Sequence, residues 1–160
     1  MFIKSCSIRG VIRMDKISKQ KRSENMSKIK SRDTSIEIKV RKYLFSLGFR
    51  YRKNVKSLPG KPDIVLPKYK TVIFINGCFW HRHPDCKYAA TPSTHQDFWQ
   101  KKFMANVQND TKHHQQLEDS GWHVIVLWEC EIKHNFLNLM ARLVKELHSQ
   151  LFINPDNFHL

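Results

Sequence analysis

Hydrophobic positions along this chain recur with two different periods, which predict helices and strands. A period of three to four residues predicts amphipathic helices over residues 34–48, 94–121 and 136–151. Thr34 and Glu37 form a capping box at the start of the first helix, and Gly48 can end it. The apolar faces comprise, in chain order, Ile36, Val40, Leu44 and Leu47; then Phe98, Trp99, Phe103 and Val107; then Phe136, Met140, Leu143, Val144, Leu147 and Leu151.

Strands are predicted where apolar residues alternate or run without a break. Residues 49–52 alternate, and residues 61–66, 71–75 and 122–128 are rich in β-branched and aromatic side chains. The unbroken run at 71–75 is typical of a strand buried on both faces, and Asn76 and Gly77 end it. The order is therefore helix, three strands, helix, strand, helix. The last strand arrives through a helix and can pair in parallel, so we expect an α/β fold with a mixed sheet covered by helices on both faces.

The net charge is more informative about function than the overall composition is. The apolar fraction of 41% is ordinary, but 28 Lys and Arg against 14 Asp and Glu give a charge of +14, which favours a nucleic-acid partner. The alternative is a basic tail on a neutral domain, although basic residues also occur throughout the body. No apolar run reaches the roughly 18 residues of a membrane helix, and the first 13 residues make a poor signal peptide. We expect a cytoplasmic, nucleoid-associated protein with no membrane partner.

The length of 160 residues fits a single domain, which we place at residues 15–155. Residues 1–14 are predicted to be a disordered extension, with Met14 as an alternative start. Residues 15–32 are basic and polar, and they are interpreted either as an arm that contacts DNA or as a solvated tail.

Cysteine and histidine residues cluster after the third predicted strand. Cys78, His83 and Cys86 lie in one loop, and Cys130 follows the last strand. A Cys₃His set is a common closed site for structural zinc, in which no coordination position is left for catalysis. His81 or Asp85 could replace one ligand, and three buried thiols are the alternative without metal.

Catalysis then needs other residues, and three candidates remain. Asp63 opens a predicted strand, where a carboxylate can hold Mg²⁺ together with substrate oxygens, or can be a turn residue. His81 is left over from the zinc set and can accept a proton near neutral pH. Glu37 could orient His81 or a metal-bound water, or act only as the helix cap.

Several motifs resemble one known family. Pro62-Asp63, Gly77-Cys-Phe-Trp-His81 and Trp128-Glu-Cys130 occur in this order. Together with their surroundings, these motifs resemble the very-short-patch mismatch repair endonucleases (Vsr) over about residues 15–150. The matching stretches are residues 22–26, 32–37, 58–63, 72–81 and 121–130, Phe98-Trp99, and Asn106 with Asp110.

The resemblance implies a restriction-endonuclease-like fold with a structural zinc, forming a single endonuclease domain. It also implies a Mg²⁺-dependent nick 5′ to the T of a T:G mismatch, a lesion that arises when 5-methylcytosine is deaminated. In such an enzyme Asp63 binds Mg²⁺ with the main-chain carbonyl of Ile75, His81 is the general base, and Glu37 supports the site. The residues implied to contact DNA are Met26, Phe79, Trp80, Trp99, Lys102 and Asn106.

The chain departs from some relatives at two adjacent positions and leaves other activities open. Ile75 and Asn76 stand where those relatives have Thr and His; the carbonyl at 75 is kept, but a second active-site imidazole is lost. The partner implied is double-stranded DNA with a T:G mismatch, bound by a monomer. Whether a mismatch-repair protein recruits this one is left open by the sequence. The alternatives are a restriction-type endonuclease on the same core and a non-catalytic zinc module that binds DNA.

Overall fold

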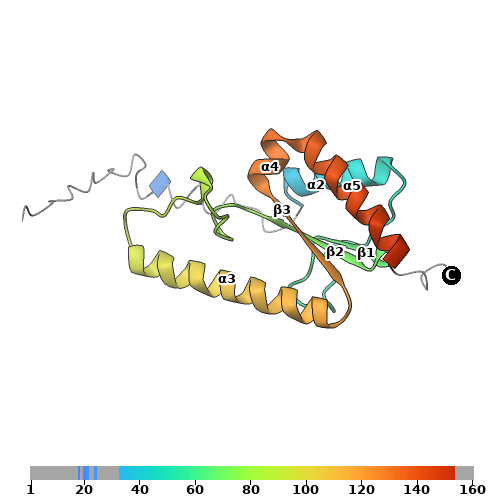
Figure 1. Ribbon diagram of the computed structural model, residues 1–160. Coiled ribbons are helices and arrows are strands. Elements are labelled where there is room, and N and C mark those ends of the chain that lie inside the picture. Colours follow the sequence, from blue (N-terminus) through green and yellow to red (C-terminus); the bar gives the residue numbers. More distant parts are fainter. Residues whose placement is uncertain (1–17, 19, 22–23, 25–32, 154–160) are drawn as a thin grey trace, which may run out of the picture.

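The computed structural model describes residues 33–153 together with 18, 20, 21 and 24 (Figure 1). The predicted extension at 1–14, most of the predicted arm at 15–32 with its Met26, and residues 154–155 lie outside the described residues. The helices are α2 (Ser35–Ser46), α3 (Gln96–Asp119), α4 (Glu129–His134) and α5 (Phe136–Ile153), with short 3₁₀ turns η1 (Pro67–Tyr69) and η2 (Lys87–Ala89). The strands are β1 (Ile64–Leu66), β2 (Thr71–Asn76) and β3 (His123–Trp128).

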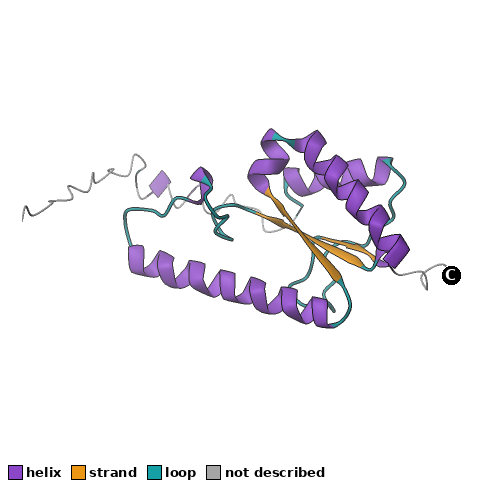
Figure 2. Ribbon diagram, viewed as in Figure 1, coloured by secondary structure: helices purple, strands orange, loops and turns teal. Residues whose placement is uncertain are grey.

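The described strands form one mixed sheet in the order β1-β2-β3 (Figure 2). β1 pairs with β2 in antiparallel fashion through a short connection, with Ile64 opposite Ile73. β2 pairs with β3 in parallel, with Thr71 opposite His123, and α3 lies in the crossover between them. The predicted parallel pairing of the last strand is therefore confirmed.

Helices cover the sheet on both sides, as the sequence predicts. Figure 1 shows α2, α4 and α5 on one side and α3 on the other. Successive side chains of a strand point to opposite faces, so Ile73 and Ile75 join the larger core while Val72 and Phe74 face Leu117 of α3. Both faces of β2 are covered, and all of its residues are buried. The larger core also includes Val40, Leu44, Ile125, Leu127, Ile132, Met140, Leu143 and Leu147.

Two predicted strands differ from the structure, and one helix was not predicted. Residues 49–52 form no strand; Arg52 makes only an isolated bridge with Val65. β1 begins at Ile64 rather than at 61, because Lys61 adopts a left-handed conformation (φ 52°) and Pro62 has no N–H for a ladder. α4 is only six residues long, too short for a helical period to be recognised in the sequence.

The apolar face predicted for α3 is only partly buried. Trp99 and Phe103 are buried, but Phe98 and Val107 are 61% and 41% exposed. The reason is that the N-terminal half of α3 extends past the sheet, as Figure 1 shows. The helix also begins at Gln96 after His95 in a left-handed conformation. None of the helices within the described ranges combines the length and apolar character needed to span a bilayer.

Candidate active site and metal centre

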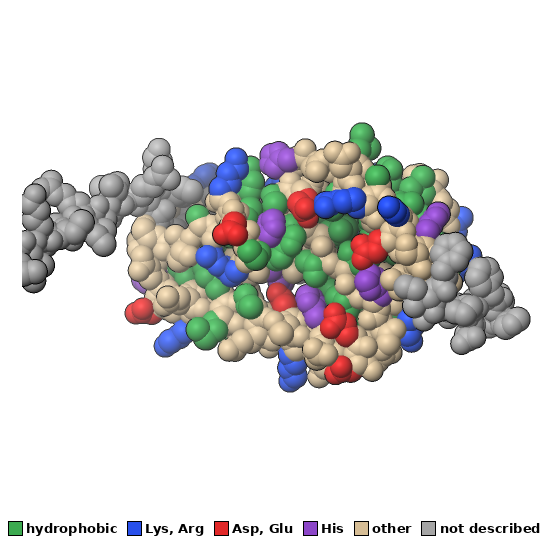
Figure 3. Space-filling view, viewed as in Figure 1, with side chains coloured by type: hydrophobic (Ala, Val, Ile, Leu, Met, Phe, Trp, Pro, Cys, Tyr) green, Lys and Arg blue, Asp and Glu red, His purple; other side chains and the backbone are tan. Residues whose placement is uncertain are grey.

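A cleft of about 1090 Å³ opens where β2 ends, between the start of α2 and the middle of α3. Acidic and histidine side chains gather near the centre of the face shown in Figure 3, where the surface is hollowed. The predicted catalytic residues Asp63, His81 and Glu37 all line this cleft, although 44 positions separate Glu37 from His81 in the sequence. The other lining residues relevant to the site are Thr34, Ile75, Asn76, Phe79, Trp80, Asp110, His113, His114, Glu129 and Lys133.

Asp63 is held directly at the end of the central strand. Its Oδ2 accepts a hydrogen bond from the backbone N–H of Ile75 at 2.7 Å. The segment before it is pressed against α3: Gly60 has φ +68°, and a Cβ there would lie 3.1 Å from that of His113. Burial raises the pKa of Asp63 to about 6, the charge of Glu37 adds to the rise, and the N–H of Ile75 opposes it. The carboxylate is therefore costly to ionise unless a cation binds it.

Glu37 caps α2 and lines the cleft at the same time. The hydroxyl of Thr34 accepts from the N–H of Glu37 at 3.4 Å and donates to Glu37 Oε1 at 2.7 Å, so the predicted capping box is present. The carboxylate reaches back to the N–H of Asp33 at 3.0 Å, one residue earlier than the standard box. Glu37 is only 5% exposed. The two roles left open by the sequence are therefore compatible.

His81 is paired with Asp110, a residue that spacing alone did not identify as part of the site. His81 Nδ1 lies 2.6 Å from Asp110 Oδ2. An ionised carboxylate can only accept, so Nδ1 carries the hydrogen in this pair and Nε2 of a neutral ring is left as the proton acceptor. One helical turn earlier, the amide of Asn106 donates to the carbonyl of Trp80 at 3.0 Å. The i, i+4 pair Asn106 and Asp110 is the sequence signal that points to this face of α3.

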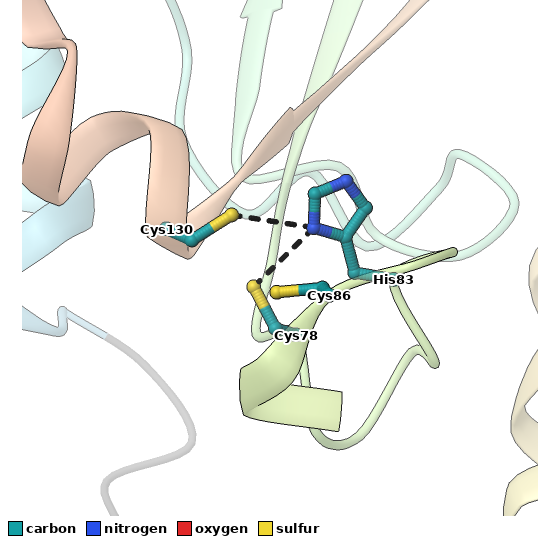
Figure 4. Close-up of side chains that lie close together, drawn as sticks. All are labelled: Cys78, His83, Cys86 and Cys130. Carbon is teal, nitrogen blue, oxygen red and sulfur yellow. Dashed lines mark hydrogen bonds between the residues drawn. The ribbon is translucent and has the colours of Figure 1, made fainter. Parts of the chain in front are cut away.

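The predicted metal ligands come together beside the cleft. Figure 4 shows Cys78, His83 and Cys86 of the loop facing Cys130, which lies in the first turn of α4. Their donor atoms all lie within 4.8 Å of one another, and His83 Nδ1 is 3.7 Å from Cys78 Sγ and 3.2 Å from Cys130 Sγ. A tetrahedron with bonds of about 2.0–2.3 Å has edges of about 3.3–3.8 Å. The group can therefore hold a metal ion, and neither His81 nor Asp85 is part of it.

Aromatic residues of the loop pack against the N-terminal half of α3. The ring of Phe79 meets Trp80, Trp99 and Phe103 edge-on, at centroid distances of 5.1, 5.3 and 5.1 Å. Trp99 is 8% exposed and is a packing residue in this cluster, whereas Phe79 and Trp80 are half-buried and line the cleft. Lys102 is exposed on α3.

Comparison with known proteins identifies the family of this chain. The family model described as DNA mismatch endonuclease Vsr matches residues 14–88. The type II nicking enzyme V.NmeAIP of Neisseria meningitidis serogroup A is 49% identical over 135 residues, 83% of this chain and 96% of that protein. The DNA mismatch endonuclease Vsr of Escherichia coli (strain K12) is 41% identical over 115 residues, 72% of this chain and 73% of that protein. The family suggested by the motifs is thus confirmed, and the chain belongs to the Vsr endonucleases.

Proposed function

We propose that this endonuclease is Mg²⁺-dependent and nicks one strand of DNA, 5′ to the T of T:G mismatches such as those left by deamination of 5-methylcytosine. The observation that carries the proposal is that one cleft holds a partly buried carboxylate (Asp63) together with an imidazole (His81) that is held by a second carboxylate (Asp110). The relatives named as a mismatch endonuclease and as nicking enzymes support a cut in one strand. The same resemblance supports a restriction-endonuclease-like fold.

The donors around Asp63 suit a hard divalent cation. Mg²⁺ binds carboxylate and carbonyl oxygens, and Asp63 with the carbonyl of Ile75 would provide both at the end of β2. When bound, the ion stabilises negative charge on the scissile phosphate and its leaving oxygen. The oxygen donors and the cost of ionising an unpaired Asp63 both fit such an ion.

His81 would act as the general base in this reaction. Its Nε2 would take a proton from the attacking water, and Asp110, hydrogen-bonded to Nδ1, would stabilise the resulting imidazolium. Glu37, whose carboxylate lines the same cleft, orients that water and adds acceptor oxygens around the site. Asn76 lines the cleft without supplying the imidazole found in some relatives, so His81 is the base on which this proposal depends.

The Cys₃His group is proposed to hold a structural zinc. A closed set of three thiolates and one imidazole leaves no position for water, so this ion would contribute stability rather than chemistry. It would tie the loop that carries Phe79, Trp80 and His81 to the first turn of α4. Deprotonation of Cys78 would accompany binding, because burial raises the pKa of that thiol to about 12.

Mismatch recognition is assigned to the aromatic residues of the loop. Phe79 and Trp80 would enter the duplex beside the poorly stacked T:G pair, where opening a base step costs less than at a Watson–Crick pair. Trp99 would have to leave its present packing to do the same, and its insertion stays a prediction, as does that of Met26. Lys102 and Asn106 are proposed to contact DNA, and the charge of +14 supplies the general attraction.

A nicking assay tests the proposal and its alternatives. Duplexes that differ only in T:G or T:A are labelled on each strand and incubated with the zinc-loaded protein, with and without Mg²⁺. A nick in the T strand of T:G alone, dependent on Mg²⁺, is the expected result. Cutting of both duplexes would indicate a restriction-type enzyme, and binding without cutting would indicate a non-catalytic module. Asp63→Asn, with zinc content confirmed, is the control for activity from a contaminating nuclease.

A further inference from the structure

A buried arginine lies directly behind the cleft, on the helix that carries Glu37. Arg41 is 5% exposed and one helical turn after Glu37. Its Nη2 lies 2.7 Å from Asp33 Oδ1 and 3.5 Å from Glu37 Oε2. Its Nη1 is buried and has no acceptor among the described residues.

Stability alone is a poor explanation for a guanidinium in this position. Burying a charge and leaving one of its nitrogens without an acceptor both cost free energy, and an apolar residue of similar volume often serves a core at least as well. What Arg41 does provide is a positive charge beside two carboxylates, Glu37 and Asp63, that line one cleft.

The contacts of Arg41 form part of a framework around the Glu37 carboxylate. Asp33 contacts both Glu37 and Arg41. Its N–H donates to Glu37 Oε2 at 3.0 Å, and its carboxylate accepts a hydrogen bond from Arg41 and lies 3.7 Å from Lys53 Nζ. Thr34 donates to the other oxygen of Glu37. Glu37 is thus held from several directions, and Arg41 is the cation among these contacts.

We propose that Arg41 is a positioning residue, which together with Asp33 fixes the Glu37 carboxylate in the cleft beside Asp63. This inference rests on the proposed function, because it assigns Glu37 a part in the cutting reaction. It predicts that Arg41 acts through Glu37 and makes no separate contribution to DNA binding, since its side chain is 5% exposed and its Nη2 contacts Asp33 and Glu37.

The test is a double-mutant cycle with Arg41→Met and Glu37→Gln, measured as single-turnover nicking rates on T:G duplex with saturating Mg²⁺. Removing a residue that orients an active-site side chain typically lowers activity by about 10–100-fold. We expect the nicking rate of Arg41→Met to fall by that much, with its DNA affinity within twofold of the parent. The double variant should be no slower than Glu37→Gln alone. Arg41→Lys, which keeps the charge without the fork, should recover part of the rate.

Effects that multiply in the double variant, or a folded Arg41→Met that nicks within twofold of the parent, would overturn the inference. If Arg41→Met does not fold, Asp33→Asn replaces it. The side chain of Asp33 is 52% exposed, so the change should be tolerated, and it removes the negative charge that lies closest to Arg41. Asp33→Asn should then slow nicking only when Glu37 is present; an equal effect in the Glu37→Gln background would refute the proposal.

Failure of the proposed function is visible separately, in the parent protein, which would then not nick T:G duplex selectively. In that case a crystal structure of Arg41→Met, or of Asp33→Asn, still decides the inference without any cutting. The Glu37 carboxylate should lose its present position in the cleft, and an unchanged carboxylate would show that Arg41 does not position it.

Discussion

The most direct physical test of the site is Asp63→Asn in protein free of Mg²⁺. Raising the pKa of Asp63 from an ordinary 3.8 to about 6 corresponds to about 3 kcal/mol of unfavourable free energy in the folded, ionised state. Asparagine carries no charge, and its carbonyl oxygen can still accept from the N–H of Ile75. We therefore expect the substitution to abolish nicking and to stabilise the fold.

The folded state binds the proton of Asp63 more tightly than the unfolded state does, and this sets how the stability depends on pH. The parent loses stability as pH rises from about 4 through 6, and the loss is complete above about pH 7. At pH 7.5 the gain of Asp63→Asn should be about 1–3 kcal/mol, allowing for relaxation of the site, which is a rise in Tm of about 3–10 °C for a domain of this size. At pH 5 the gain should be roughly half as large.

The assay is thermal unfolding followed by circular dichroism from pH 5 to 8, in buffers passed over chelating resin so that zinc stays bound while Mg²⁺ is absent. Asp119→Asn, an exposed carboxylate of α3, is the matched control and should move Tm by little at any pH. Two results would refute the argument that burial makes the charge of Asp63 costly. One is a Tm for Asp63→Asn at or below that of the parent at pH 7.5. The other is a difference in Tm between variant and parent that does not change with pH.

Three further outcomes are expected. Cys86→Ser should lose the zinc ion and fold in lower yield, whereas His81→Ala should keep one zinc per chain. Metal analysis of both purified variants tests this. Loss of zinc from His81→Ala would contradict the assignment of His81 as the base and not a zinc ligand. His81→Ala should slow nicking by about 10²–10⁴-fold, and Asp110→Asn should slow it through the same imidazole, so a double variant no slower than His81→Ala is expected in single-turnover assays. Phe79→Ala and Trp80→Ala, if folded by circular dichroism, should lower the ratio of nicking rates on T:G and T:A duplexes; an unchanged ratio in both would remove them as mismatch wedges.

Most of the chemistry of the candidate site was recognisable before the structure, because it is concentrated in short motifs. Cys78, His83, Cys86 and Cys130 were predicted as one metal group, and their donor atoms do converge. Asp63, His81 and Glu37 were predicted as one site, and they line one cleft. Asp110 was not named as a catalytic residue, because a carboxylate on a long polar helix face looks like any solvated one until its partner across 29 positions is known.

Local patterns in the sequence determined α2, α3, α5, the central strand and the mixed α/β class, but not the six-residue α4. They could do so because periodicity, caps and turn residues act over a few positions: the capping box at Thr34 and the buried run of β2 needed no distant contact to be recognised. Tertiary structure decided what depends on neighbours far along the chain. Residues 49–52 alternate but have only one bridging partner, and Phe98 and Val107 lie on a helix that extends beyond the sheet it covers. Burial in the same way set the pKa of Asp63 and the surroundings of Arg41, because desolvation is a property of the assembled fold and not of any short stretch of sequence.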